Sequence, residues 1–148
     1  MLLIKTKRDN ILMPLQSVCG IVEKRHTLPI LSNVLIEKSG DQLTLLATDI
    51  EIQIRTHTAG TGGPEKTAVT VGARKLQDIL RSLPDSAEIS LELSDKRLQV
   101  RSGKSRFNLQ TLPAEDYPRM SQAESEQAGF QLTQKQFKRL IGLVQYAM

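Results

Sequence analysis

The segment KTAVTVGARKLQDILRSLP, residues 66–84, joins an alternating apolar run to an amphipathic helix pattern. Up to Gly72, apolar and polar residues alternate as they do in a half-buried strand. Beyond it, apolar residues fall at i, i+3, i+4 and i+7, the spacing of one helix face; they are Leu76, Ile79, Leu80 and Leu83. Gly72 can serve as the N-cap, and Pro84 stands where the helix should end. The segment therefore predicts a strand that leads directly into a helix.

The same pattern occurs twice more in the chain, once before this segment and once after it. The four apolar positions are Ile11, Pro14, Leu15 and Val18 in the first copy, and Phe137, Leu140, Ile141 and Val144 in the third. Gly20 should end the first helix, and Thr133 with Gln136 makes a capping box at the start of the third. Pro14 removes a backbone hydrogen bond, so the first helix is expected to kink there or to start late.

Alternating segments follow each of the first two helices in groups of three. They are residues 33–38, 42–48 and 51–58, then residues 88–93, 97–102 and 105–110. Turn signals such as SGDQ and SDKR separate them closely enough to predict antiparallel hairpins. The fold class expected is α+β, with a duplicated β-α-β-β-β unit and two helices packed on antiparallel sheets.

This organisation predicts one domain over residues 1–128, in which the Pro-containing polar stretch LPAEDYPRMSQAESEQ is a linker. Residues 129–148 are expected to be the truncated start of a second domain, a strand and a helix. The apolar face of that helix has no sheet of its own here. The segment should therefore be mobile, or borrow a surface from its own first domain or from a neighbouring copy.

Composition excludes several classes of protein. The chain has 148 residues, one cysteine (Cys19) and two histidines, too few for a disulfide framework or a zinc ligand set. No apolar run reaches the roughly 20 residues that span a bilayer, so a protein of the reducing cytoplasm, without membrane contact, is expected. Aromatic residues make up 3%, which argues against stacking single-stranded nucleic acid on aromatic side chains, and the net charge of +4 says little by itself.

Three features could suggest an enzyme, and each has a simpler interpretation. GTGGPEKT, residues 60–67, resembles a phosphate-binding loop, but Glu65 replaces the required glycine and a strand follows, so a crossover loop is predicted. Asp49 and Glu51 could be paired acids, but with isoleucines alternating beside them they are expected on the solvated side of a strand. Cys19 has no histidine placed to activate it. A hydrolase or nucleotidyltransferase is therefore only a minor alternative.

Basic residues lie on the outer faces of the predicted helices. Arg74 and Arg81 point away from the second apolar stripe, Lys135 and Arg139 do the same on the third helix, and Lys24 and Arg25 follow the first. Each could simply be a solvated face. Helices stacked side by side would, however, present a continuous positive surface suited to phosphates.

GKSRFNLQ, residues 103–110, is basic on one side and apolar on the other, and it ends its unit at an expected sheet edge. Such an edge can pair with a partner, or its charges can block aggregation. From the residues alone the two interpretations remain open.

Several phrases together resemble the bacterial sliding clamp family, the beta subunit of DNA polymerase III. They are TLPILSNVLIE, LLATDIEIQI, VGARKLQDILRSLP, LQVRSGKSRFNLQTLPAEDYP and FQLTQKQFKRLI, in the family's order through nearly the whole chain. The resemblance implies a non-catalytic processivity factor of DNA replication, without cofactor or metal. It implies a homodimeric ring of two subunits, each with three domains, in which helices face duplex DNA without reading its sequence.

The resemblance also assigns residues. Arg25 and Arg74 match positions on the DNA side. Matches to the subunit interface are Lys75, Arg97, Lys104 and Arg106 for its basic part and Phe107 and Leu109 for its apolar part, which favours pairing for the edge strand. The acidic half of that interface, and the pocket for the replicative polymerase and the clamp loader, would lie in regions absent here. A stand-alone DNA-binding module is the alternative.

Overall fold

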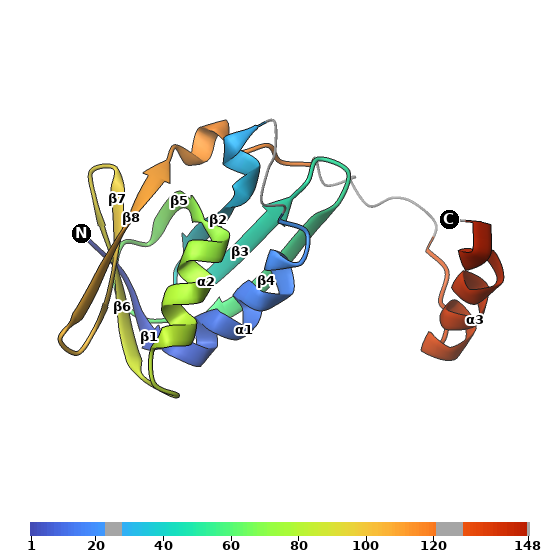
Figure 1. Cartoon of the computed structure of the whole chain (residues 1–148), viewed down its shortest axis with the longest axis horizontal. Coiled ribbons are helices and arrows are strands. Elements are labelled where there is room, and N and C mark those ends of the chain that lie inside the picture. The colour runs from blue at the N-terminus through green and yellow to red at the C-terminus, as the bar shows by residue number, and fades with distance from the viewer. Residues whose placement is uncertain (23–27, 121–128, 148) are drawn as a thin grey trace.

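A computed structural model describes residues 1–22, 28–120 and 129–147 of the chain (Figure 1). The first repeat comprises β1 (Leu2–Lys7), α1 (Arg8–Cys19), the 3₁₀ turn η1 (Pro29–Ser32), β2 (Asn33–Ser39), β3 (Gln42–Thr48) and β4 (Gln53–Ala59). The second comprises β5 (Lys66–Gly72), α2 (Ala73–Ser82), β6 (Glu88–Ser94), β7 (Arg97–Ser102) and β8 (Ser105–Leu112). Then come η2 (Ala114–Asp116), α3 (Gln134–Val144) and η3 (Gln145–Ala147). The predicted β-α-β-β-β duplication is confirmed.

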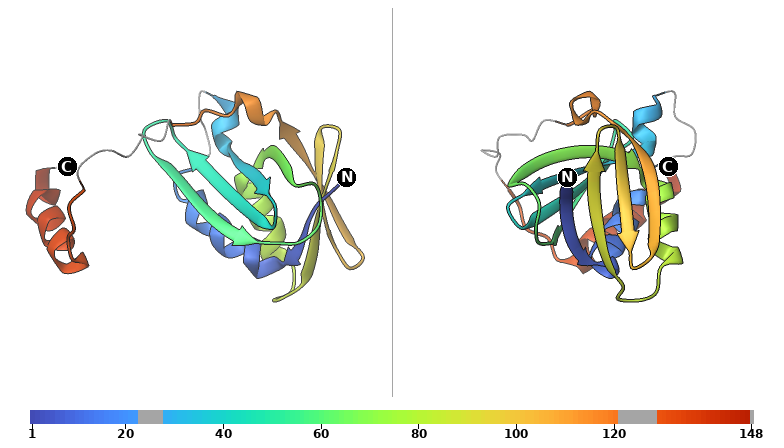
Figure 2. Two further views of the ribbon diagram at one scale, coloured as in Figure 1. Left: turned by 180° about the vertical axis from the view of Figure 1, so that it is seen from behind. Right: turned by 90° about the vertical axis from the view of Figure 1, so that its left-hand side faces the viewer.

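The strands form one eight-stranded antiparallel sheet in the order β1-β6-β7-β8-β5-β2-β3-β4. It curls, so its two halves face different directions in Figure 2. Each repeat's last three strands are hairpin neighbours, and β5 joins the halves by pairing with β2 along its length and with the end of β8. At the outer ends, the Lys5 and Thr61 backbones exchange hydrogen bonds of 2.8 and 3.1 Å. This bridge draws β1 toward the segment that follows β4.

Both helices pack on one face of the sheet and against each other (Figure 1). Their predicted apolar stripes supply much of the core, because Ile11, Leu15 and Val18 of α1 and Leu76 and Leu80 of α2 are fully buried. Alternation in β2 separates two faces: Ile36 joins the helices, whereas Leu35 points to the other side. Burial of these side chains is the main source of stability for residues 1–120.

The other face of the sheet carries a smaller cluster built around Tyr117. Tyr117 packs with Leu35 and Leu46, and its hydroxyl accepts from the Thr48 amide and donates to the Asn33 carbonyl, both at 3.2 Å. Burial raises the pKa of Tyr117 to about 12, and the hydrogen bond from Thr48 opposes that shift. The prediction that a linker begins at residue 112 is therefore wrong, because this anchor holds the chain on the sheet beyond β8.

The glycines of GTGGPEKT serve close packing against β1. A Cβ at Gly60 would lie 2.0 Å from Cδ1 of Ile4, and one at Gly63, where φ is +76°, would lie 2.2 Å from the Leu3 carbonyl oxygen. Nζ of the buried Lys38 donates to the Pro64 carbonyl at 2.8 Å. The segment is the crossover loop that the sequence predicts.

The strand predicted over residues 51–58 begins later, at Gln53. Residues 49–52 form a tight turn in which Oδ1 of Asp49 accepts from the amides of Glu51 (3.0 Å) and Ile52 (2.7 Å). Ile50 has a φ of 85°, and both Ile50 and Ile52 are 53% exposed. The prediction that Asp49 and Glu51 lie on a strand with alternating isoleucines is therefore wrong, because residues 49–52 form this turn before β4 begins.

The first helix begins at Arg8 and runs through Pro14, so the predicted late start is not observed. Arg8 is buried and ties this helix to the end of α2. Its Nε donates to the Leu80 carbonyl at 2.7 Å, and its guanidinium pairs with Asp9 and Asp85. Gly20 caps the helix as predicted.

The third copy of the pattern is a helix without a sheet. The capping box of Thr133 and Gln136 is present as predicted. Residues 129–133 form no strand, which corrects the expected strand and helix, since no described neighbour lies alongside to pair with them. All described residues of α3 are exposed, and the helix stands apart from the sheet in Figure 1. Assignment of residues 129–148 to a second domain stays a prediction.

Candidate nucleic-acid and subunit interfaces

The exposed side of α2 carries a row of charged residues. Arg74, Asp78 and Arg81 lie on the face opposite the buried Leu76 and Leu80. Arg74 donates from its guanidinium to the Val22 carbonyl at 2.7 Å, which holds the segment after α1 against α2. Arg81 makes no ion pair within the described residues. Sequence reasoning placed both arginines on this face correctly.

Beside it, the exposed side of α1 is uncharged. Asn10, Met13, Gln16 and Ser17 point away from the sheet, and α1 packs alongside α2. We call the exposed residues of the two helices, these four with Arg74, Asp78 and Arg81, the helix face. Its charge is only weakly positive.

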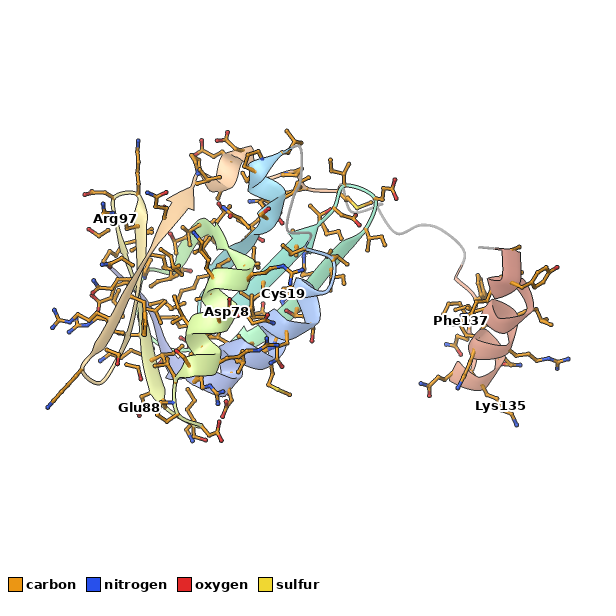
Figure 3. All side chains as sticks on the ribbon, viewed as in Figure 1. Cys19, Asp78, Glu88, Arg97, Lys135 and Phe137 are labelled. Carbon is orange, nitrogen blue, oxygen red and sulfur yellow. The ribbon has the colours of Figure 1, made fainter. Side chains whose placement is uncertain are left out.

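The other predicted DNA-binding residues do not join the helix face in the structure. Lys24 and Arg25 lie outside the described residues. Lys135 and Arg139 are exposed on α3, which shows no packing against α1 or α2 (Figure 3). The positive surface expected from side-by-side helices is therefore formed only in part by the described residues.

Cys19 lies beneath the helix face and is 6% exposed. Burial raises the pKa of its thiol, while the positive charges of Arg74 and Arg81 lower it and Asp78 adds to the rise. The net effect favours the protonated thiol, which is a poor nucleophile. Cys19 serves as a small core residue.

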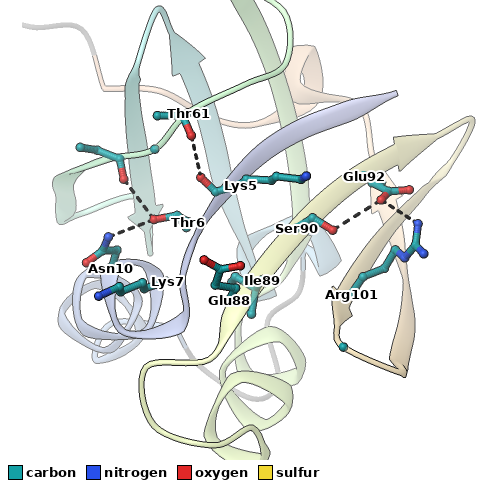
Figure 4. Close-up of a pocket in the computed structure, with 13 residues that line it drawn as sticks. Lys5, Thr6, Lys7, Asn10, Thr61, Glu88, Ile89, Ser90, Glu92 and Arg101 are labelled. Carbon is teal, nitrogen blue, oxygen red and sulfur yellow. Dashed lines mark hydrogen bonds and ion pairs between the residues drawn. The ribbon is translucent and has the colours of Figure 1, made fainter.

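A polar pocket of about 780 Å³ lies where β1, β6 and the segment after β4 meet (Figure 4). Arg101 pairs with Glu92 at 3.1 Å, and Ser90 donates to the same carboxylate at 3.4 Å. Lys5 and Lys7 of β1 face this side as well. Its lining carries charges of both signs, and the ion pair of Arg101 with Glu92 lies within it.

Neither a metal site nor a membrane span is found in the part of the chain that the structure describes. Within it, no group of three or more His, Cys, Asp or Glu side chains is arranged to hold a metal ion. None of the helices it contains combines the length and the apolar character that crossing a membrane requires.

The basic strand β8 is a sheet edge over most of its length. Residues 105–110 pair with β7 on one side, whereas β5 pairs only with Thr111 and Leu112. Lys104 and Arg106 are exposed near the β7–β8 turn, while Phe107 and Leu109 pack toward the core. The predicted edge is confirmed for residues 105–110, and the two residues that follow them in β8 pair with β5.

An open groove of about 840 Å³ runs between the start of α2 and β8. The predicted residues Lys75, Arg97 and Leu109 meet there, whereas Lys104, Arg106 and Phe107 lie farther along the edge. Sequence reasoning missed Lys96 and Leu112. Their only signal was that they continue the predicted hairpin beyond the pair Arg97 and Gln110, where the Thr111 amide donates to the Lys96 carbonyl. The groove is lined by the cations Arg74, Lys75, Lys96 and Arg97 without a carboxylate, and by the apolar side chains of Val22, Pro29, Leu109 and Leu112.

Comparison with known proteins adds an independent finding. A family described as DNA polymerase III beta subunit, N-terminal domain, matches residues 2–121. Relatives named beta sliding clamp from Proteus mirabilis and Escherichia coli K12 are 46% and 44% identical over 142 residues, 96% of this chain. The chain spans only 38% of the length of each of these relatives.

Solved structures agree with these matches. A crystal structure of the DNA polymerase III subunit beta from Pseudomonas aeruginosa superposes with a TM-score of 0.89 at 39% identity, over 98% of this chain and 39% of that one. A structure of Caulobacter crescentus pol III beta gives 0.76 at 41% identity, over 80% of this chain and 32% of that one.

Proposed function

This chain belongs to the DNA polymerase III beta subunit family, and we propose that it supplies the first domain of a sliding clamp. Such a clamp is a ring that encircles duplex DNA and holds the replicative polymerase on it, as a processivity factor without catalytic activity of its own. The observation that carries this proposal is the match of the family over residues 2–121 together with the superposition on a solved beta subunit at a TM-score of 0.89.

The helix face is the proposed DNA side. Arg74 and Arg81 would contact backbone phosphates, joined by Lys24 and Arg25 after α1 and by Lys135 and Arg139 on α3. Among the described residues, the exposed side of these two helices carries no further helix or strand that could enter a groove and read base edges. Contacts of this kind bind all sequences alike and weaken as salt rises, which suits a ring that must move along DNA.

The groove and the open edge of β8 form the proposed subunit side. Arg97 and Lys75 would attract an acidic surface of a second subunit, and the newly found Lys96 would add to them. Leu109, Leu112 and Phe107 offer apolar contact, while Lys104 and Arg106 extend the positive charge along the strand. Free backbone groups of residues 105–110 can accept another strand, so the charged edge serves pairing in this proposal.

Remaining partners would engage regions beyond this chain. We propose that the polymerase and the clamp loader bind elsewhere in the full ring, and that α3 begins a second domain whose sheet covers its apolar face. A reducing cytoplasm fits the free, buried Cys19.

DNA titration tests the proposal. Binding to two duplexes of unrelated sequence should be equal and should weaken sharply between low and high salt. Replacing Arg81 by glutamine should weaken binding severalfold at low salt. The matched control is Arg55→Gln, because Arg55 is exposed on the sheet face opposite the helices and should have little effect. Strong preference for one duplex would instead favour a sequence-specific DNA-binding module.

A further inference from the structure

Asp78 is an acidic residue in the middle of the basic row on α2. It follows Arg74 by four residues and precedes Arg81 by three, so at about 100° per residue it lies about 40° from one and about 60° from the other around the helix. Its side chain is exposed. Along the helix axis a negative charge therefore stands between the two arginines proposed to contact phosphates, and around the helix it lies to one side of both.

No ion pair neutralises Asp78 among the described residues. Spacings of three and four residues would allow a pair with either arginine. Arg74 instead donates to the Val22 carbonyl at 2.7 Å. All three charges nevertheless act on one place, because each shifts the pKa of the Cys19 thiol beneath them. The negative charge of Asp78 and the positive charges of the two arginines therefore act on the same region of the helix face.

The first repeat shows that a helix packed on the sheet does not require an acid at this position. With the three apolar stripes aligned, Arg74 corresponds to Lys135 of α3, and Asp78 corresponds to Arg139 of the same helix. In α1 the residue that corresponds to Asp78 is Met13. One structural position is therefore neutral, acidic and basic in the three copies, and exposed in all of them. Packing therefore does not determine the charge at this position, so the charge can act on whatever binds the surface.

We propose that Asp78 limits the strength with which the helix face binds phosphates. This inference rests on the proposed function, since it needs DNA at that face. A carboxylate between two arginines repels a phosphate that approaches either of them, while leaving the attraction of the whole face in place. Contact then stays weak enough for DNA to move past, and α2 acts as a guide along which no phosphate is held firmly.

Its effect is modest because all partners are exposed to water. A single charge about 7 Å from a phosphate changes affinity by roughly threefold at low salt, and by less once the Debye length of about 10 Å is reached near 0.1 M salt. A structural role for Asp78 makes a different prediction: its removal would lower the stability of α2 and would not tighten DNA binding.

The test compares Asp78→Asn with Glu115→Gln in the 148-residue chain. Glu115 lies in η2, which packs on the other face of the sheet, so the control has the same change in net charge far from the helix face. Affinity for a fluorescent duplex is measured by anisotropy at about 50 mM and about 200 mM salt, and the urea midpoint of each variant is recorded. Arg81→Gln is measured alongside.

Asp78→Asn should bind roughly threefold more tightly than the parent chain at the lower salt, with a smaller gain at the higher salt. Glu115→Gln should bind like the parent, and both urea midpoints should be unchanged. Equal gains in both variants would attribute the effect to net charge and overturn the inference. A loss of binding in Arg81→Gln without any gain in Asp78→Asn would overturn the inference while supporting the proposed function. No binding by any variant would overturn both.

Discussion

α2 and α3 have the same spacing of apolar residues, yet only α2 buries them. In α2 the residues Leu76 and Leu80 are fully buried, whereas their counterparts in α3, Phe137 and Ile141, are 56% and 42% exposed. Both segments form helices, and both direct the stripe to one side. The spacing therefore specifies a helix and its apolar face, but a sheet must be present for that face to be buried.

The two helices also differ in how they begin. The first turn of α2 follows Gly72, which offers no side-chain cap, so the helix depends on its contacts with the sheet and α1. The first turn of α3 has a complete capping box and no such contacts among the described residues. Tertiary packing stabilises one helix, and local hydrogen bonds stabilise the other.

Equivalent truncations should separate the two helices most clearly. Leu80→Ala should lower the free energy of unfolding by about 2–5 kcal/mol, because it leaves a cavity in the core. Ile141→Ala, at the corresponding position of α3, should change it by less than about 0.5 kcal/mol, because the side chain is already in water. Urea denaturation followed by circular dichroism gives both values, and similar losses for the two variants would break the comparison.

Tyr117 tests where the packed region ends. Its hydroxyl accepts from the Thr48 amide and donates to the Asn33 carbonyl. Tyr117→Phe should therefore lower the free energy of unfolding by about 1–3 kcal/mol, because it removes the partner of both buried groups. Should the substitution be neutral, the segment after β8 would be a linker after all, as the sequence predicted.

The raised pKa of Tyr117, about 12 in the folded protein against a usual value of 10, adds a dependence on pH. Because the fold favours the neutral phenol, this contribution is fully present below pH 10 and is lost as pH rises toward 12, by at most about 3 kcal/mol. Unfolding curves of the parent chain and of Tyr117→Phe should converge over that range, and parallel curves would contradict the assignment.

The smallest effect is expected at the start of α3. Thr133→Ala removes the hydroxyl that accepts from the Gln136 amide at 3.2 Å, which should destabilise this helix by about 1 kcal/mol. Helix content should fall slightly while the urea midpoint of residues 1–120 stays constant. A shift of that midpoint would show that α3 is coupled to the rest.

Periodicity and turn residues were enough to predict the duplicated unit, because each strand and helix of the core buries one regular face. At two places, local hydrogen bonds produce a structure that differs from the one the periodicity predicts. Asp49 turns the chain and exposes Ile50 and Ile52, and Tyr117 pins a Pro-containing stretch that reads as a linker. Both depend on hydrogen bonds that involve a side chain, which periodicity does not register.

The candidate surfaces were predictable to a lesser degree. Outward-facing Arg74 and Arg81 followed from helix spacing alone. The meeting of Lys75, Lys96 and Arg97 in one groove did not, because α2 and the β6–β7 turn come together only in the curled sheet. The hydrogen bond from Arg74 to the Val22 carbonyl is also a tertiary contact, which helix spacing does not predict.

Native-state hydrogen exchange tests the central claim most directly, because it reads α2 and α3 in one experiment on one sample. Amides in the middle of α2 should exchange only through global unfolding of residues 1–120, whereas amides of α3 should exchange through local opening with little protection. Equal protection of the two helices in dilute solution would contradict the claim that the apolar face of α3 lacks a sheet to cover it.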